Sequence, residues 1–297
     1  MTTALSSTGL FQPVHYRTAH IDNLDIFYRE AGRQSSPVIL LLHGFPTSSN
    51  MFRNLIPRLS DSFRVIAPDY PGFGQSSMPA HTEFAYTFEN ITNIVEKLVQ
   101  QLQLRRFALY VMDYGAPVGY RLALRHPEQV QALIVQNGNA YEEGLREFWE
   151  PIKKYWQEGS ADNRKALHSL VEPKATQWQY QNGVADPSLL DPTAWLVDQA
   201  GLDRPGNREI QMDLFYDYRT NVPLYPQFQA FFRKHQPPTL ILWGKNDHIF
   251  PPEGAAPYER DLRHVETHLL DTGHFALETH CDEIAGRMEG FLQRNVR

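Results

Sequence analysis

Short apolar segments that end at turn residues most constrain what this chain can fold into. Three of them are continuous enough to be strands buried on both faces: residues 37–44, 106–113 and 238–247. Weaker strand candidates follow the same pattern at residues 63–69, 130–138 and 266–273. Helical patterns lie between the strands, at residues 88–104, 115–126, 253–263 and 279–294. This alternation predicts an α/β fold, with a mostly parallel sheet covered by helices on both faces.

Two segments depart from this alternation. Residues 15–32 alternate between polar and apolar side chains, with Asp22 and Asn23 at a turn, which predicts an N-terminal hairpin. Residues 139–228 have no convincing strand, and they contain four of the five tryptophans: Trp149, Trp156, Trp178 and Trp195. We expect a helical cap over 139–228, inserted between core segments 1–138 and 229–297, that covers a site at the carboxyl ends of the strands.

Composition excludes several classes of protein. The chain has 28 Lys and Arg against 34 Asp and Glu, a formal net charge of −6, and no basic cluster, so a nucleic-acid partner is not expected. Its one cysteine, Cys281, excludes an internal disulfide framework and a cysteine-based metal site. The first 18 residues do not resemble a signal peptide, and no apolar run is long enough to cross a membrane. We therefore expect a soluble, cytoplasmic protein.

The segment from Val111 to Gly115 carries the first chemical signal. An apolar strand meets a turn and then a helix, which is the arrangement that lifts a nucleophile above a sheet. The centre of this turn is Asp113, where the usual pattern has serine. A carboxylate in this place can also be an ordinary helix cap, so the pentapeptide does not decide between the two interpretations.

Other strand ends support the catalytic interpretation. Asp247 follows the strand at 238–247, and His274 follows the last predicted strand, so the chain order is nucleophile, acid, histidine. The strand at 37–44 leads into His43-Gly44-Phe45-Pro46, a loop that can direct the backbone N–H of Phe45 toward the turn. The N–H of Tyr114 would be its partner in an oxyanion hole. We expect His43 and the glycine-rich segment 67–77 to be structural.

These residues resemble the α/β-hydrolase superfamily, from about Tyr16 to Leu292. Aspartate at the nucleophile position resembles the branch that includes epoxide hydrolases, haloalkane dehalogenases and fluoroacetate dehalogenases. The resemblance implies the α/β-hydrolase fold, a triad of Asp113, Asp247 and His274, and no cofactor; we also expect no metal.

The charge of a carboxylate explains the reaction expected of such a triad. A carboxylate is ionised at neutral pH, so it can attack an sp³ carbon without a base and form an alkyl-enzyme ester. Water activated by His274, which Asp247 orients, would then hydrolyse the ester. We expect a small apolar electrophile and water as the reactants, and a monomer or a homodimer.

An epoxide is the electrophile that the resemblance favours. Epoxide opening leaves an alkoxide, which needs a proton donor. The segment 216–221 resembles the second tyrosine motif of epoxide hydrolases, which makes Tyr218 a candidate. Ile152 occupies the position of the first family tyrosine, so Tyr155, one helical turn away, is a substitute; Tyr141 is a further possibility.

Dehalogenation remains the alternative. Haloalkane dehalogenases typically have tryptophan after the nucleophile and asparagine or glutamate at the position of Phe45, and both are missing here. Fluoroacetate dehalogenases have arginines just after the nucleophile. Here the first arginine after Asp113 is Arg121, on the predicted helix. Trp156 is a possible halide donor for a haloalkane or haloacid substrate. A further alternative, from another class, is a non-catalytic ligand-binding protein with this fold.

Overall fold

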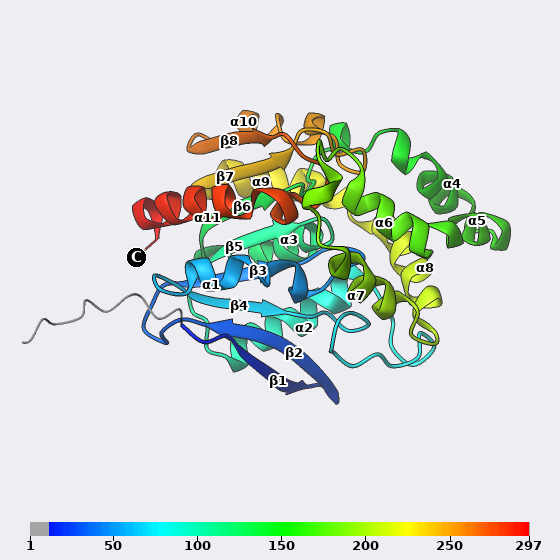
Figure 1. Cartoon of the computed structure of the whole chain (residues 1–297), viewed down its shortest axis with the longest axis horizontal. Coiled ribbons are helices and arrows are strands. Elements are labelled where there is room, and N and C mark those ends of the chain that lie inside the picture. The colour runs from blue at the N-terminus through cyan, green and yellow to red at the C-terminus, as the bar shows by residue number, and fades with distance from the viewer. Residues whose placement is uncertain (1–11, 297) are drawn as a thin grey trace, which may run out of the picture.

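The computed structural model describes residues 12–296. One eight-stranded sheet runs through the molecule in the order β1-β2-β4-β3-β5-β6-β7-β8 (Figure 1). Its strands are β1 His15–Ile21, β2 Leu24–Ala31, β3 Val38–Leu42, β4 Arg64–Pro68, β5 Phe107–Met112, β6 Val130–Gln136, β7 Thr239–Gly244 and β8 Val265–Leu270. β2 is antiparallel to β1 and β4, and every other pair is parallel, which confirms the mostly parallel sheet.

Eleven α-helices complete the described part of the chain. They are α1 Leu55–Leu59, α2 Phe88–Gln101, α3 Gly115–Arg125, α4 Glu150–Glu158, α5 Ala161–Ala166, α6 Pro173–Gln181, α7 Pro192–Leu202, α8 Asn207–Asp217, α9 Tyr225–His235, α10 Tyr258–Asp261 and α11 Ala276–Asn295. Short 3₁₀ turns connect several of them, including Tyr218–Thr220 and Pro252–Gly254.

Two apolar layers lie on opposite faces of the sheet. Leu40 and Leu42 of β3 pack in one layer with α2, α3 and α9. Ile39 and Leu41, the alternate residues of the same strand, pack in the other layer with α1 and α11. Successive side chains of a strand point to opposite faces, so a strand between two layers has to be apolar throughout. This is why the central strands are continuous apolar segments.

The N-terminal hairpin forms as predicted. β1 and β2 pair in antiparallel register, and Ile21 lies opposite Leu24. Between them Asp22 and Asn23 have φ of 49° and 65°. Positive φ at both central residues matches the right-handed twist of two-residue hairpins, and aspartate and asparagine tolerate it well.

The predicted helix over 253–263 is wrong. The segment contains only a 3₁₀ turn, Pro252–Gly254, and the four-residue α10. Pro257 has no N–H to donate, and its ring obstructs the preceding turn, so a continuous helix cannot pass through it. The short helix α1 was not predicted, and α11 begins at Ala276, three residues before the predicted start.

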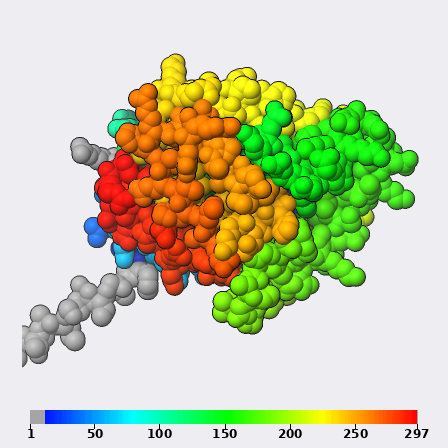
Figure 2. All heavy atoms as spheres, turned by 90° about the horizontal axis from the view of Figure 1, so that it is seen from above, coloured from blue at the N-terminus to red at the C-terminus, as the bar shows by residue number. Residues whose placement is uncertain are grey.

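The segment 139–228 has no strand among its residues, all of which the structure describes. Helices α4 to α8 are grouped beyond the carboxyl ends of the parallel strands, at one end of the molecule (Figures 1 and 2). The expected boundary at residue 228 falls inside α9, which packs against α3. The division into core and cap stays a prediction.

Over residues 12–296, no helix is both long enough and apolar enough to span a membrane. The same residues contain no group of three or more His, Cys, Asp or Glu side chains that could hold a metal ion. Residues 1–11, on which the expectation about a signal peptide largely depends, lie outside the described part of the chain.

Candidate active site

A strained turn presents the Asp113 carboxylate. Asp113 lies between the end of β5 and the start of α3, and its φ is 49°. Positive φ is uncommon for a residue with a side chain and is held only where the surroundings enforce it. Here α3 packs closely on the sheet, since a Cβ on Gly115 would lie 2.2 Å from the carbonyl oxygen of Leu42.

Two backbone N–H groups converge on one oxygen of this carboxylate. The N–H of Phe45 donates to Oδ1 of Asp113 at 2.7 Å, and the N–H of Tyr114 donates to the same atom at 2.5 Å. The loop can approach so closely because residue 44 is glycine, where a Cβ would lie 2.5 Å from Oδ1. The two N–H groups expected from the sequence therefore meet at a single point, and that point is the carboxylate itself.

His274 lies between the two aspartates. Its Nδ1 is 2.7 Å from Oδ2 of Asp247, and its Nε2 is 3.9 Å from Oδ2 of Asp113. Nε2 is buried and has no hydrogen-bond partner among the described residues. Asp247 follows β7 and His274 follows β8, so the structure brings all three predicted residues together at the carboxyl edge of the sheet.

Asn137, which was not predicted from the sequence, holds Asp247 in place. Asn137 Nδ2 donates to Oδ2 of Asp247 at 2.7 Å, while Asn137 Oδ1 accepts from the N–H of Gly244 at 3.0 Å. The N–H of Ile249 donates to the other carboxylate oxygen of Asp247 at 2.7 Å. Asn137 directly follows β6, so its position at the same edge of the sheet was a usable signal.

The electrostatics of the site follow from burial and from neighbouring charges. Burial raises the pKa of Asp113 to about 6, although the His274 charge and the two N–H groups oppose this shift. Burial by itself lowers the pKa of His274, but the charge of Asp247, its hydrogen bond and the charge of Asp113 together outweigh burial and raise it. At neutral pH the Asp113 carboxyl is still largely ionised, and it lies beside a His274 imidazole that is more basic than usual.

Asp113 opens into a small pocket, about 410 Å³ in all when the space open to solvent is included. Its walls come from the core and from α4, α6 and α8, and most of the side chains are aromatic or aliphatic. The lining residues are Phe45, Asp113, Tyr114, Phe148, Trp149, Ile152, Leu170, Ala175, Trp178, Gln179, Phe215 and Ile249. Apart from Asp113, the lining residues with a polar side-chain group are Tyr114, Trp149, Trp178 and Gln179, so the pocket suits a small apolar molecule.

The tyrosines proposed as proton donors do not line this pocket. The hydroxyl of Tyr218 hydrogen-bonds to that of Tyr225. The hydroxyl of Tyr155 accepts from Nη1 of Arg164 at 3.0 Å, and that of Tyr141 donates to Asp261 at 2.8 Å. On α4 the pocket is lined by Ile152, whereas Tyr155 is not a lining residue and its hydroxyl is held by Arg164 instead.

The indole N–H groups of Trp149 and Trp156 both donate to backbone carbonyl oxygens. Trp156 Nε1 donates to the carbonyl oxygen of Phe215 at 2.7 Å, and Trp156 does not line the pocket. Trp149 does line it, but its Nε1 donates to the carbonyl oxygen of Ile249 at 2.8 Å. A halide in the pocket would have to compete with Ile249 for the Trp149 donor, and the Trp156 donor is out of its reach.

His43 is structural, as expected. Burial lowers the pKa of His43 to about 4, so its imidazole is neutral at neutral pH. Its Nδ1 lies 2.9 Å from the carbonyl oxygen of Gly44, and its Nε2 accepts from the N–H of Tyr70 at 3.2 Å. The segment 67–77 has a similar duty, since Asp69 accepts from the N–H of Ser49 at 2.7 Å and ties down the loop after Phe45.

Comparisons with known proteins identify the family of this chain. A sequence model described as the alpha/beta hydrolase fold matches residues 37–280. An uncharacterized hydrolase of Saccharomyces cerevisiae is 45% identical over 278 residues, which cover 92% of this chain and 95% of that protein. A haloalkane dehalogenase of Bradyrhizobium diazoefficiens is 26% identical over 311 residues, covering 94% of each chain. The chain therefore belongs to the α/β-hydrolase family, among relatives that include haloalkane dehalogenases.

Solved structures show the same fold. The epoxide hydrolase CorEH superposes with a TM-score of 0.76 at 20% identity, covering 95% of this chain and 99% of that one. The haloalkane dehalogenase DbeA from Bradyrhizobium elkani superposes with a TM-score of 0.77 at 22% identity, covering 96% and 100%. At these identities the likeness concerns the fold alone.

Proposed function

We propose that this protein is a hydrolase in which Asp113 attacks an sp³ carbon of a small apolar substrate. One observation carries the proposal: Oδ1 of Asp113 is held by two N–H groups, and Oδ2 faces a pocket and an unpartnered nitrogen of His274. A capping aspartate would use its carboxylate on the N–H groups of the following helix turn and would need neither the loop of Phe45 nor the histidine.

In the first step Oδ2 forms a bond to the substrate carbon as the leaving group departs. The nucleophile needs no base, because a carboxyl with a pKa of about 6 is largely ionised at neutral pH. Hydrogen bonds at Oδ1 keep the carboxylate in one orientation, so Oδ2 is the oxygen left to attack. The product is an alkyl ester of Asp113.

In the second step water attacks Cγ of that ester. His274 Nε2 takes a proton from the water, and Asp247 stabilises the imidazolium through the 2.7 Å contact at Nδ1. Negative charge develops on Oδ1, where the N–H groups of Phe45 and Tyr114 already point. The ester then breaks, and the alcohol leaves.

An epoxide is the electrophile that the pocket supports best, and the product is then a diol. The indole N–H of Trp149 donates to a backbone carbonyl and is not free to hold a halide, which leaves Trp178 as the pocket tryptophan without such a bond among the described residues. Tyr114, which lines the pocket, has a buried phenolic hydroxyl without a partner among the described residues, and a phenol of this kind can protonate an oxygen leaving group. The cap tyrosines expected from the family resemblance do not line the pocket, so they do not support this choice.

Haloalkane dehalogenation is the second candidate. It is favoured by the Gln179 amide in the pocket wall and by the dehalogenase relative at 26% identity over nearly the full length. A haloacid fits less well, because no arginine or lysine lines the pocket to hold its carboxylate. A non-catalytic binding protein would have no need for a complete triad with this geometry.

The test is to trap the ester. His274→Gln should allow the first step and stop the second, so intact-protein mass spectrometry with a panel of epoxides and alkyl halides should show an added mass on Asp113. Asp113→Asn in the same background is the matched control and should show none. If no adduct forms with any epoxide or alkyl halide of the panel, the proposal is wrong. With the parent enzyme, diol formation or halide release separates the two candidates.

A further inference from the structure

Tyr114 has a side chain whose hydroxyl serves no structural purpose. The residue is 2% exposed, and its hydroxyl has no hydrogen-bond partner among the described residues. A buried hydroxyl without a partner costs about 1–3 kcal/mol, and a phenylalanine of nearly the same shape would avoid that cost. Tyr70 and Tyr114 both have a buried hydroxyl without a partner among the described residues, but only Tyr114 lines the pocket, so a functional explanation is sought for Tyr114.

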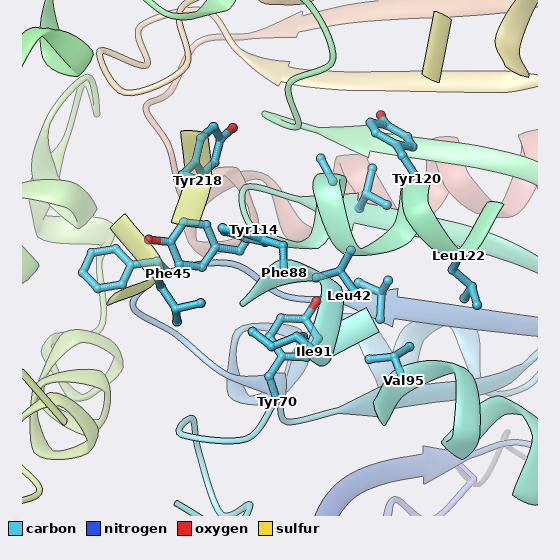
Figure 3. Close-up of a cluster of buried hydrophobic side chains, with 14 of the residues drawn as sticks. Leu42, Phe45, Tyr70, Phe88, Ile91, Val95, Tyr114, Tyr120, Leu122 and Tyr218 are labelled. Atoms are coloured by element: carbon cyan, nitrogen blue, oxygen red, sulfur yellow. The ribbon is translucent and has the colours of Figure 1, made fainter. Parts of the chain in front are cut away.

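The surroundings of Tyr114 hold its ring at the pocket wall. Phe88 packs edge-on against it with ring centroids 4.9 Å apart, and Phe45 packs at 5.8 Å. Its own N–H is bound to Asp113 Oδ1 at 2.5 Å, so the backbone is fixed as well. Figure 3 shows the Tyr114 hydroxyl directed toward the Phe45 ring, whereas the Tyr218 hydroxyl points away from both residues.

The Tyr114 hydroxyl is also protonated at neutral pH, as a proton donor has to be. Burial and the nearby charges of Asp113 and Asp217 raise the pKa of Tyr114 well above its ordinary value. The phenol is therefore neutral at neutral pH and carries a proton to give. Tyr114 lines the same pocket as Asp113, so nucleophile and donor face one substrate.

We propose that the Tyr114 hydroxyl is the acid that protonates the departing oxygen of an epoxide. The inference rests on the proposed function of Asp113 and names its substrate class: an uncharged aryl- or alkyl-substituted epoxide. The aromatic walls formed by Phe148, Trp149 and Trp178 suit such substituents.

The proton balance closes over the cycle. Asp113 Oδ2 forms a bond to the epoxide carbon, the ring C–O bond breaks, and the freed oxygen takes the proton of Tyr114 to leave a phenolate. Water then cleaves the ester with His274 as base and conjugate acid, which releases the diol and leaves Asp113 as a carboxylic acid. The phenolate takes that proton, so carboxylate and phenol are both restored.

The experiment compares two electrophiles in the His274→Gln background, an aryl epoxide and a benzylic bromide of the same skeleton. The rate of adduct formation on Asp113 is measured by rapid quench and intact-protein mass spectrometry. Tyr114→Phe should slow the reaction with the epoxide by ~100-fold or more, since it removes a general acid. The reaction with the bromide, whose leaving group needs no proton, should change by less than about threefold.

Tyr70→Phe is the matched control. Tyr70 also has a buried hydroxyl without a partner, but it does not line the pocket, so its loss should leave both rates unchanged. Tyr218→Phe tests the rival donor. Equal epoxide rates with and without the Tyr114 hydroxyl would overturn the inference, as would a larger loss in Tyr218→Phe or a parallel loss with both electrophiles.

The outcomes also separate this inference from the proposed function. Adducts with the bromide but with no epoxide would overturn the role of Tyr114 and leave Asp113 as the nucleophile. No adduct with either electrophile, in a protein that retains Tyr114, would overturn both. Thermal unfolding of each variant confirms that the comparisons are made on folded protein.

Discussion

Nε2 of His274 lies 3.9 Å from Oδ2 of Asp113, while Nδ1 of the same ring lies 2.7 Å from Oδ2 of Asp247. The short contact orients the ring and the long one leaves Nε2 unbonded. A nitrogen that was already hydrogen-bonded to the nucleophile would have to release it before accepting a proton from water. The arrangement therefore suits a base that acts after the nucleophile has reacted.

The first prediction concerns pH. The pKa of Asp113 is raised to about 6, so the carboxylate is protonated, and unable to attack, below that value. The rate of ester formation should fall by about tenfold per pH unit below pH 6 and level off above it. Rapid-quench measurement of the adduct across this range checks the prediction. A rate that stays flat from about pH 7 down to about pH 5 would contradict it.

The second prediction concerns stability. Because the pKa of Asp113 is higher in the folded protein than its ordinary 3.8, ionisation of the carboxyl destabilises the fold as pH rises from that value through about 6. Asp113→Asn keeps an oxygen for the two N–H groups and removes the buried charge. It should raise the free energy of unfolding by about 1–3 kcal/mol above neutral pH.

This gain has a characteristic pH dependence, which serves as its control. Below about pH 3 the parent carboxyl is protonated in both states, so the two proteins should then unfold alike. Urea unfolding at about pH 8 and at about pH 3 measures both differences. An Asp113→Asn protein that is less stable than the parent at the higher pH would show that the carboxylate stabilises the fold instead.

The third prediction concerns Gly44. A Cβ there would lie 2.3 Å from Cβ of Asp113 and 2.5 Å from Oδ1, where neither atom can move without distorting the turn. Gly44→Ala should lower turnover by ~100-fold or more because it displaces the loop that presents the N–H of Phe45. Steady-state kinetics check this.

Gly286→Ala is the matched control for the change at Gly44. Gly286 lies inside α11, and an added Cβ would meet nothing within 4 Å. Alanine is favoured over glycine in a helix by roughly 0.5–1 kcal/mol, so this variant should be slightly more stable and fully active. Full activity in Gly44→Ala would show that the close approach of the loop is not needed.

The fourth prediction concerns Asn137. Its side chain makes two hydrogen bonds, to Asp247 at 2.7 Å and from Gly244 at 3.0 Å, while its φ of 44° suits glycine. Asn137→Gly removes both bonds without straining the backbone. We expect hydrolysis of the ester to become slower than its formation. The alkyl-enzyme should then accumulate even though the enzyme retains His274.

Mass spectrometry of the Asn137→Gly protein during turnover measures that accumulation. Asn93→Gly offers a comparison, because Asn93 bonds to Arg125 on α3 and has no contact with the triad. An ester population equal to that of the parent enzyme would remove Asn137 from the positioning of Asp247.

Much of the fold followed from local patterns. Each buried strand is a short apolar segment because it lies between two apolar layers, and the Asp22-Asn23 hairpin follows from residues that tolerate positive φ. The predicted helix over 253–263 is wrong because the prediction did not allow for the proline inside it. Asn137 was missed because an amide at a strand end has no chemistry of its own until its partner is known.

By itself the sequence determined which side chains stand at the carboxyl edge of the sheet. Asp113 directly follows β5, while Asp247 and His274 lie in the short loops after β7 and β8. Parallel strands share that edge, so the meeting of the three residues could be inferred without coordinates. Only the tertiary structure decided which aromatic groups of α4 to α8 face the pocket. A helix shows different residues on each side, and its rotation depends on packing partners distant in sequence, so Tyr155 and Tyr218 face away while Tyr114, fixed beside the nucleophile, faces in.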